Sequence, residues 1–320
     1  MASESGPRSP RAAFLLVLAI LGVVAVPAAL TLRTVHVGPA IDGSVMNPSP
    51  YGYSVSLLLF LVPTAVIGLW LIPLEGVPVS KKSFGLTIAI LFPIGALLDF
   101  CFATKFFTFP NPDATLRIAA PAIGGSVPVE EYVFYLSGFV FMLLLYIWLD
   151  EYWLGAYSVP NHHWKRTSFT RLLQFHPLSL LWAGGLIAAA IGYKEFVVQE
   201  PGFPGYFTFL VLAALAPSAA LFPSALPVIN WRALSLQLFL VLLISLLWEA
   251  TLALPYGWWG FQDAAMIGIR VTAWSRLPIE EVVVWVAVSY ATVIVYENVR
   301  RWQSSGKRIG EAFLGSAAKR

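Results

Sequence analysis

The chain has 320 residues, of which 58% are hydrophobic and 12% are charged. An average soluble domain carries about 25% charged residues, so this composition predicts a protein dissolved in lipid. The formal net charge of +3 is too small to indicate binding to nucleic acid, and a single cysteine, Cys101, excludes a disulfide framework.

Eight apolar segments have the length that a helix needs to cross the hydrocarbon core, about 20 residues. They lie near 13–32, 54–73, 84–104, 131–149, 177–193, 205–224, 234–254 and 281–298. A helix satisfies its own backbone hydrogen bonds, which lipid cannot do for it. We therefore predict an all-α, polytopic transmembrane helix bundle of about eight spans.

Basic residues gather between alternate spans. With the N-terminus inside, fourteen of the 20 Lys and Arg residues fall in inner segments and six in outer ones. The positive-inside rule then predicts a multi-pass protein of the cell membrane with both termini in the cytoplasm. Arg8 and Arg11 before the first apolar stretch also fit a signal peptide, but the length of that stretch favours a retained helix.

The sequence matches itself when it is shifted by 150 residues, without a gap, over the third and fourth spans and the seventh and eighth. Asp99 falls on Glu249, and Pro128-Val129-Glu130-Glu131 falls on Pro278-Ile279-Glu280-Glu281. This register predicts two tandem parallel pseudo-repeats. The first half is 1–153, a cytoplasmic linker is 154–176, the second half is 177–303, and a basic cytoplasmic tail is 304–320.

Six acidic side chains are candidate catalytic residues: Asp99, Glu130, Glu131, Glu249, Glu280 and Glu281. Asp99 and Glu249 lie roughly 7 Å inside the ends of their predicted spans, where a charge is costly and usually faces a cavity or a partner. The glutamate pairs also suit a helix start, because acids there favour the helix dipole. Adjacent helical residues point about 100° apart, so one glutamate of each pair can face inward. We expect Glu130 and Glu280 to join Asp99 and Glu249 at one cavity.

Burial in an apolar cavity favours the neutral carboxylic acid by more than a helix dipole favours the carboxylate. A buried carboxyl can therefore serve as a general acid. Aromatic residues are predicted at the same depth, and their ring faces can stabilise a cation, although an aromatic belt at the bilayer surface explains them too. The candidates for substrate contact are Phe106, Phe134, Trp248, Trp258 and Trp259.

Sequence motifs for cofactors are missing. No Gly-x-Gly-x-x-Gly follows a strand, and the four histidines lack metal-ligand spacing. We therefore expect no cofactor and no metal. Acid–base catalysis and ion-coupled transport remain as the two classes of function.

The stretch Pro-Val-Glu-Glu-Tyr-Val-Phe at 128–134 and the stretch Leu-Pro-Ile-Glu-Glu at 277–281 resemble the paired motif of the membrane lycopene cyclase domain family. This family occurs in heterodimeric and fused carotenoid cyclases of bacteria, archaea and fungi. Residues 255–263, Pro-Tyr-Gly-Trp-Trp-Gly-Phe-Gln-Asp, are also similar to a loop of the family. The resemblance covers roughly 84–153 and 234–303, and the two copies differ where Val284 takes the place of Phe134.

The resemblance implies an isomerase of the intramolecular lyase type that closes rings at the ends of lycopene without a cofactor. It carries the essential acidic role over to Glu130, Glu131, Glu280 and Glu281. It also implies a lipid-soluble carotenoid substrate taken from the bilayer, with other carotenoid-pathway enzymes as expected partners. Two alternatives stay open: an ion-coupled secondary transporter, which also combines repeats with intramembrane acids, and a membrane terpene cyclase for another isoprenoid.

Overall fold

The computed structural model describes residue 18, residues 49–158 and residues 169–315. The chain is mostly helical, and seven helices within these ranges are long and apolar enough to cross a membrane. Seven of the eight predicted spans coincide with these helices, and the predicted span at 13–32, apart from residue 18, lies outside the described residues. The prediction of a helical bundle with the character of a membrane protein is confirmed.

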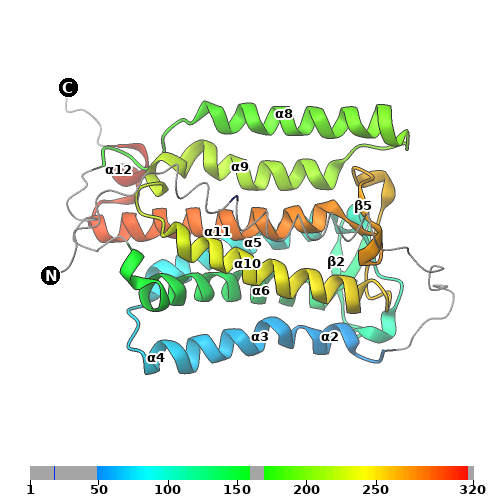
Figure 1. Cartoon of the computed structure of the whole chain (residues 1–320), viewed down its shortest axis with the longest axis horizontal. Coiled ribbons are helices and arrows are strands. Elements are labelled where there is room, and N and C mark those ends of the chain that lie inside the picture. The colour runs from blue at the N-terminus through cyan, green and yellow to red at the C-terminus, as the bar shows by residue number, and fades with distance from the viewer. Residues whose placement is uncertain (1–17, 19–48, 159–168, 316–320) are drawn as a thin grey trace.

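The long helices run alternately toward and away from the end of the bundle that carries the strands, at the right in Figure 1. In chain order the helical segments are α2 Gly52–Ser56, α3 Leu58–Ala65, η1 Val66–Leu71, α4 Ile72–Leu74, α5 Lys81–Phe106, α6 Val129–Trp148, η3 Leu149–Trp153, α8 Pro177–Tyr193, η5 Lys194–Val198, α9 Gly205–Ala225, α10 Trp231–Trp248, η6 Glu249–Ala253, α11 Ile279–Ser305 and α12 Ile309–Leu314. Segments α2 to α4 form one continuous span, and η3, η5 and η6 are π-helical continuations of the helices before them.

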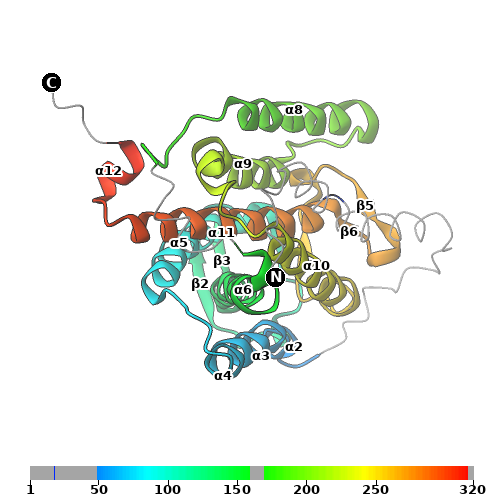
Figure 2. The same ribbon diagram turned by 60° about the vertical axis from the view of Figure 1, so that its left-hand side comes forward.

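Helices α6 and α11 lie at the centre of the bundle. The segment α2 to α4 packs on one side of α6, whereas α9 and then α8 lie on the other side, beyond α11 (Figures 1 and 2). In the most apolar stretch of each span, the buried share of residues is 61% for α11, 56% for the α6 span and 17% for the α8 span. The two central helices therefore bring side chains from both parts of the chain to the middle of the protein.

The helix starts explain how these residues reach their positions. Ser80 and Asn230 are N-caps, and their side-chain oxygens accept hydrogen bonds from the backbone N–H groups of Ser83 and Ala233. Helices α6 and α11 both begin directly after a proline in an extended conformation, with φ −60° and ψ 143° at Pro128 and φ −67° and ψ 145° at Pro278. Each pair of starts is separated by 150 residues, as the sequence alignment predicts.

The loops 107–128 and 254–278 gather at one end of the bundle, which we call the loop end. They form three two-stranded antiparallel pairs. The strands are β1 Phe107–Thr108 with β4 Gly260–Phe261, β2 Ala119–Ala122 with β3 Gly125–Pro128, and β5 Arg270–Val271 with β6 Leu277–Pro278. Three-residue 3₁₀ turns lie between the strands, at η2 Pro112–Ala114, η7 Asp263–Ala265 and η8 Thr272–Trp274. The pair β1–β4 joins the two loops, because Phe107 lies opposite Phe261.

Lys194 attaches the α8 span to the loop end. Its side chain is fully buried, and its ammonium group donates to the carbonyl oxygens of Asp263, Ala264 and Met266 at 3.0, 2.8 and 2.5 Å. A buried charge is tolerated when hydrogen bonds replace its water. This contact fixes the turn η7 against the end of a helix that otherwise packs mainly on α9.

The opposite end of the bundle contains an ion cluster that joins α6 to α11. Arg300 on α11 pairs with Asp150 at 3.3 Å, with Glu151, and with Glu297 at 3.9 Å. The hydroxyl of Tyr146 donates to Glu297 at 2.8 Å. Asp150 and Glu297 are buried, so the charge of Arg300 compensates carboxyl groups that have little access to water.

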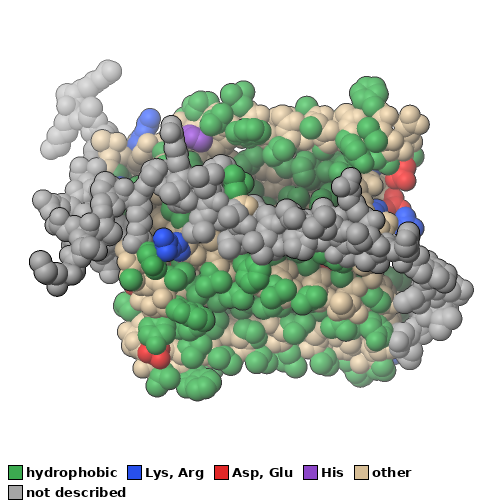
Figure 3. All heavy atoms as spheres, viewed as in Figure 1, with side chains coloured by type: hydrophobic (Ala, Val, Ile, Leu, Met, Phe, Trp, Pro, Cys, Tyr) green, Lys and Arg blue, Asp and Glu red, His purple; other side chains and the backbone are tan. Residues whose placement is uncertain are grey.

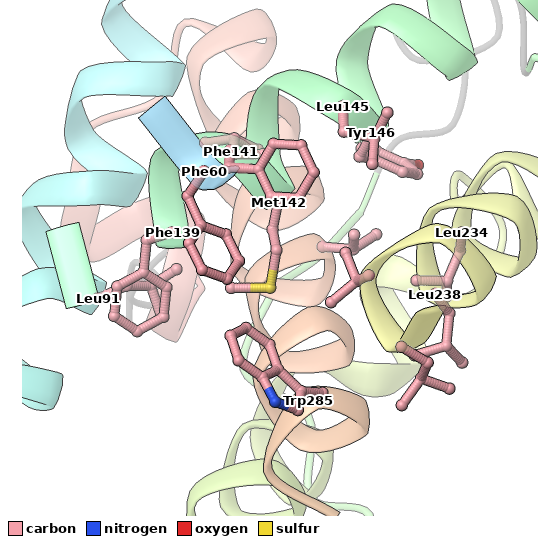
Figure 4. Close-up of a cluster of buried hydrophobic side chains, with 14 of the residues drawn as sticks. Phe60, Leu91, Phe139, Phe141, Met142, Leu145, Tyr146, Leu234, Leu238 and Trp285 are labelled. Carbon is pink, nitrogen blue, oxygen red and sulfur yellow. The ribbon is translucent and has the colours of Figure 1, made fainter. Parts of the chain in front are cut away.

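Apolar packing fills the space between the helices and covers the outside of the bundle. Near the middle, Phe60, Met142 and Trp285 come together from three different helices (Figure 4), and the rings of Phe60 and Trp285 stack with centroids 5.7 Å apart. On the face shown in Figure 3, hydrophobic side chains cover the long flank and charged ones lie towards the ends. That distribution suits a bundle surrounded by lipid.

Candidate functional site

A cavity of about 660 Å³, counted with its open mouth, lies between α6 and α11 near the loop end. Eleven of its 18 lining residues are aromatic, so aromatic side chains make up most of the wall. The lining residues are Tyr53, Phe107, Phe109, Glu131, Phe134, Tyr135, Gly138, Phe139, Met142, Tyr206, Trp248, Glu249, Trp259, Phe261, Glu281, Val284, Trp285 and Val288.

Equivalent positions of the two central helices face each other across this cavity. Counted from the two helix-starting prolines, four lining positions of α6 recur on α11, each 150 residues later. The pairs are Glu131 and Glu281, Phe134 and Val284, Tyr135 and Trp285, and Gly138 and Val288. The cavity is thus lined by the same helix face twice, with side chains of different size at three of the four positions.

Glu131 belongs to a hydrogen-bonded group from the first part of the chain. Its carboxyl oxygen Oε1 accepts a hydrogen bond of 2.6 Å from the hydroxyl of Tyr53. Asp99 on α5 lies behind Glu131, beside Tyr135, and does not line the cavity. Both oxygens of Asp99 are buried and lack a hydrogen-bond partner of normal length. The structure therefore brings Asp99 next to a cavity carboxyl but gives it no direct access to a ligand.

Glu281 and Glu249 form the corresponding group in the second part. The indole N–H of Trp285 donates to Glu249 Oε1 at 2.8 Å. Glu281 faces both Glu249 and Tyr206. Glu249 is at the position equivalent to Asp99, and its longer side chain reaches the cavity. Both Glu249 and Glu281 therefore line the cavity.

None of the described residues that line the cavity is Lys, Arg or His. Three carboxyl groups in apolar surroundings without a cation cannot all be ionised, because each charge lacks solvation and repels the others. At least one of Glu131, Glu249 and Glu281 therefore carries a proton. A neutral carboxylic acid and a carboxylate in one cavity are the two reagents of acid–base catalysis.

Glu130 and Glu280 lie away from the cavity and hold the loops. Glu130 Oε1 accepts hydrogen bonds from the backbone N–H of Leu116 at 2.6 Å and from Ser54 Oγ at 2.5 Å. Glu280 Oε1 accepts one from the backbone N–H of Ile267 at 2.6 Å. From the sequence we expected these two glutamates at the cavity, and that placement is wrong because neither of them lines it. In each pair, the carboxyl of the first glutamate accepts a hydrogen bond from a backbone N–H of the loop, and the second glutamate points into the cavity.

We expect Glu130→Ala to destabilise the protein and Glu130→Gln to be nearly neutral. The amide oxygen of glutamine can still accept from Leu116 and Ser54, whereas alanine removes both hydrogen bonds, at a cost of about 0.5–1.5 kcal/mol each. Unfolding of the purified protein in detergent micelles measures the difference. Equal destabilisation by the two substitutions would show that the negative charge, and not the acceptor oxygen, holds the loop.

The aromatic candidates divide into two groups. Phe134, Trp248 and Trp259 line the cavity. Trp258 lies behind it, where its indole N–H donates to Ser49 Oγ at 2.8 Å. Phe106 packs beside Tyr206, with ring centroids 5.3 Å apart, and supports the wall without lining it.

Tyr53 and Tyr206 are site residues that the sequence reasoning missed. Each follows a glycine at the start of a long helix, as Gly52-Tyr53 and Gly205-Tyr206, and each lies against a cavity glutamate. These dipeptides are 153 residues apart, so an alignment at a fixed shift of 150 does not superpose them. The shared Gly-Tyr at the two helix starts was the available signal.

Comparisons of the chain with protein-family models, with curated proteins and with solved structures gave no match.

Proposed function

We propose that the chain is a carotenoid cyclase of the lycopene type, which forms ionone-type rings at the ends of a linear carotenoid. The observation that carries this proposal is the cavity, where three carboxyl groups lie among aromatic side chains and no lining residue in the described part of the chain is a cation. A hydrocarbon substrate offers no group for polar recognition. A wall of ring faces with a proton donor and a proton acceptor suits its chemistry better than a polar pocket does.

The reaction would need only proton transfers. An acid protonates the terminal double bond and creates a tertiary carbocation, which the neighbouring double bond attacks to close a six-membered ring. A base then removes a proton from a carbon beside the cation, with no net redox change and no cofactor. Faces of Phe134, Trp248 and Trp259 at the cavity would stabilise the cation, at about 0.5–2 kcal/mol for each ring in a desolvated site.

The proposal includes the finer architecture inferred from the sequence. The matching helix starts, 150 residues apart, and the facing pairs on α6 and α11 support two tandem parallel pseudo-repeats. We further propose that residues 13–32 provide an eighth span and that both termini face the cytoplasm. The loop end, with the cavity below it, would then lie at the outer side of the cell membrane.

The test is expression of the full chain in bacteria that accumulate lycopene, followed by chromatography of the extracted pigments. We expect monocyclic or bicyclic carotenoids at the expense of lycopene. Unchanged lycopene in cells whose membranes contain the folded chain would contradict the proposal. A proton-dependent uptake of solute by vesicles carrying the same chain would favour a transporter instead.

A further inference from the structure

A group of four aromatic side chains, which we call the aromatic seam, joins α5 to α9 near the loop end. It consists of Phe102 and Phe106 on α5 and of Tyr206 and Phe209 on α9. We propose that the aromatic seam is a side entrance through which a long apolar molecule passes between the bilayer and the cavity. The identity of that molecule as a linear carotenoid rests on the proposed function, whereas the place of the entrance rests on the packing of the helices.

The aromatic seam lies at a depth that lipid surrounds. Phe102 is four residues before the end of α5 and Phe209 is four residues after the start of α9, so each lies about 6 Å inside the end of its helix. Both helices are long and apolar enough to cross a membrane. Phe102 is 45% exposed and does not line the cavity. Its exposed edge would therefore contact acyl chains.

Ring contacts lead from Phe102 to the cavity without a break. Phe102 stacks on Phe106 with ring centroids 5.6 Å apart, and the ring of Phe106 lies 5.3 Å from that of Tyr206. Tyr206 is in turn 5.2 Å from Phe107, and both of these side chains line the cavity. This line of rings runs between α5 and α9 from the outer surface of the bundle to the cavity wall.

Side chains, more than backbones, hold the two helices together at this point. Helices α5 and α9 each pack closely on α11 (Figure 2), but they share few close backbone contacts with each other. Phe106, Tyr206 and Phe209 belong to a small apolar cluster that is separate from the main core of the bundle. Opening the aromatic seam would thus disturb a small cluster and leave the central packing in place.

The aromatic seam is closed in this structure, but hydrogen bonds do not hold its phenylalanine rings. The ring of Phe106 lies so close to the start of α9 that a Cβ atom added at Gly205 would be 3.2 Å from it. On the α2 side of the cavity, in contrast, Tyr53 donates to Glu131 and Trp258 donates to Ser49. Phenylalanine carries no hydrogen-bonding group, so its ring can change rotamer at no cost in hydrogen bonds.

The entrance would lead directly to a cavity carboxyl. Val284 packs against the small apolar cluster and also lines the cavity. It is three residues after Glu281 on α11, and side chains at this spacing are neighbours on one face of a helix. A chain that enters end first would therefore bring its end to the carboxyl groups while the rest of its length stays in the bilayer.

The first experiment measures access to the cavity and does not depend on catalysis. Cys101 is the single cysteine of the chain, so Cys101→Ala combined with Val284→Cys leaves one thiol, on the cavity wall. A maleimide with a hexadecyl chain, dissolved in the liposomes that carry this protein, should label that thiol. Phe102→Ala removes the ring pairs with Phe106 and Phe209. It should speed the labelling about 2- to 10-fold for each lost pair, because an aromatic pair stabilises the closed state by about that factor.

Phe100→Ala is the matched control. Phe100 lies on the same helix, is 41% exposed and is not part of the aromatic seam, so its replacement should leave the labelling rate unchanged. Phe209→Ala should raise the rate from the other side of the seam. Equal rates for Phe102→Ala and Phe100→Ala would overturn the entrance. So would an equal gain from Phe102→Ala for a charged maleimide that stays in water, because the seam would then open to water.

The second experiment connects the entrance with the proposed cyclase. In the Cys101→Ala chain, Phe102→Cys modified with pyrene maleimide should lose most of its rate of lycopene conversion, whereas the same modification at Phe100→Cys should not lower it. Full conversion by the modified Phe102→Cys chain would refute this route. A wild-type chain that leaves lycopene unchanged removes the proposed function, and the labelling rates then still decide whether the entrance exists.

Discussion

Replacing Gly138 with leucine is expected to lower the rate of the proposed cyclisation at least about 100-fold while the protein stays folded. Gly138 lines the cavity on α6, seven residues after Glu131 and therefore about 10 Å deeper along the same helix face. A Cβ atom added at this position meets no other atom within 4 Å. The leucine side chain would therefore extend into the space that the substrate needs, and a displacement of about 1 Å at a reacting centre can cost about 100-fold in rate.

Two further variants isolate the effect of volume. Gly138→Ala adds a single methyl group and should retain most of the activity, with a small gain in helix stability. Gly184→Leu adds the same bulk on α8, where a Cβ atom also meets nothing within 4 Å and no lining residue is affected. Pigment analysis together with the amount of folded protein in the membrane measures all three. Full activity of Gly138→Leu would mean that the substrate does not occupy this cavity.

Arg300→Met should produce the largest loss of stability, about 3–5 kcal/mol, which is typical when one partner of a buried ion pair is removed. The substitution leaves Asp150, Glu151 and Glu297 facing one another without the cation that compensates them. Because Asp150 and Glu151 lie on η3, which continues α6, and Glu297 lies on α11, their repulsion would act between the two central helices. Unfolding in micelles with increasing denaturing detergent measures the change.

An exposed ion pair of the same residue types supplies the comparison. Arg117 and Asp113 form an ion pair in a loop, with Arg117 Nη2 2.5 Å from Asp113 Oδ1. The exposed fractions of their side chains are 70% and 44%. Surface pairs contribute about 0–1 kcal/mol, so Arg117→Met should have little effect on stability. A loss below about 1 kcal/mol for Arg300→Met as well would show that the buried carboxyl groups relax by taking up protons or water.

The helices and their starts were the most predictable part of the protein. Length and hydropathy define spans, and Pro128 and Pro278 each precede a helix at the next residue, because proline suits a helix N-terminus and an acid pair follows. The alignment of the two copies and the span lengths also predicted that Asp99 and Glu249 lie at the depth of the glutamate pairs. These features depend on residues that are close together in the chain, so they can be recognised from the sequence.

The rotation of each glutamate pair was not predictable in the same way. Whether Glu130 or Glu131 faces the cavity depends on the loop N–H of Leu116, which competes for one carboxyl and is unrelated to helix periodicity. Tyr53 reaches Glu131 across 78 positions of sequence. Such a contact depends on how whole helices pack, and no local pattern specifies that packing. The pairing of β1 with β4 escaped prediction for the same reason.

That strand pairing has a consequence for the fate of a reactive cation. Phe107 and Phe261 are register partners in β1 and β4, and both also line the cavity. The two loops therefore contribute paired phenylalanine side chains to the wall of the cavity at the loop end. A carbocation that meets water becomes an alcohol, so a wall made of phenylalanine rings would decide between a cyclic alkene and a hydrated by-product. In such an enzyme, the loops would influence whether the product is an alkene or an alcohol, and not only the shape of the product.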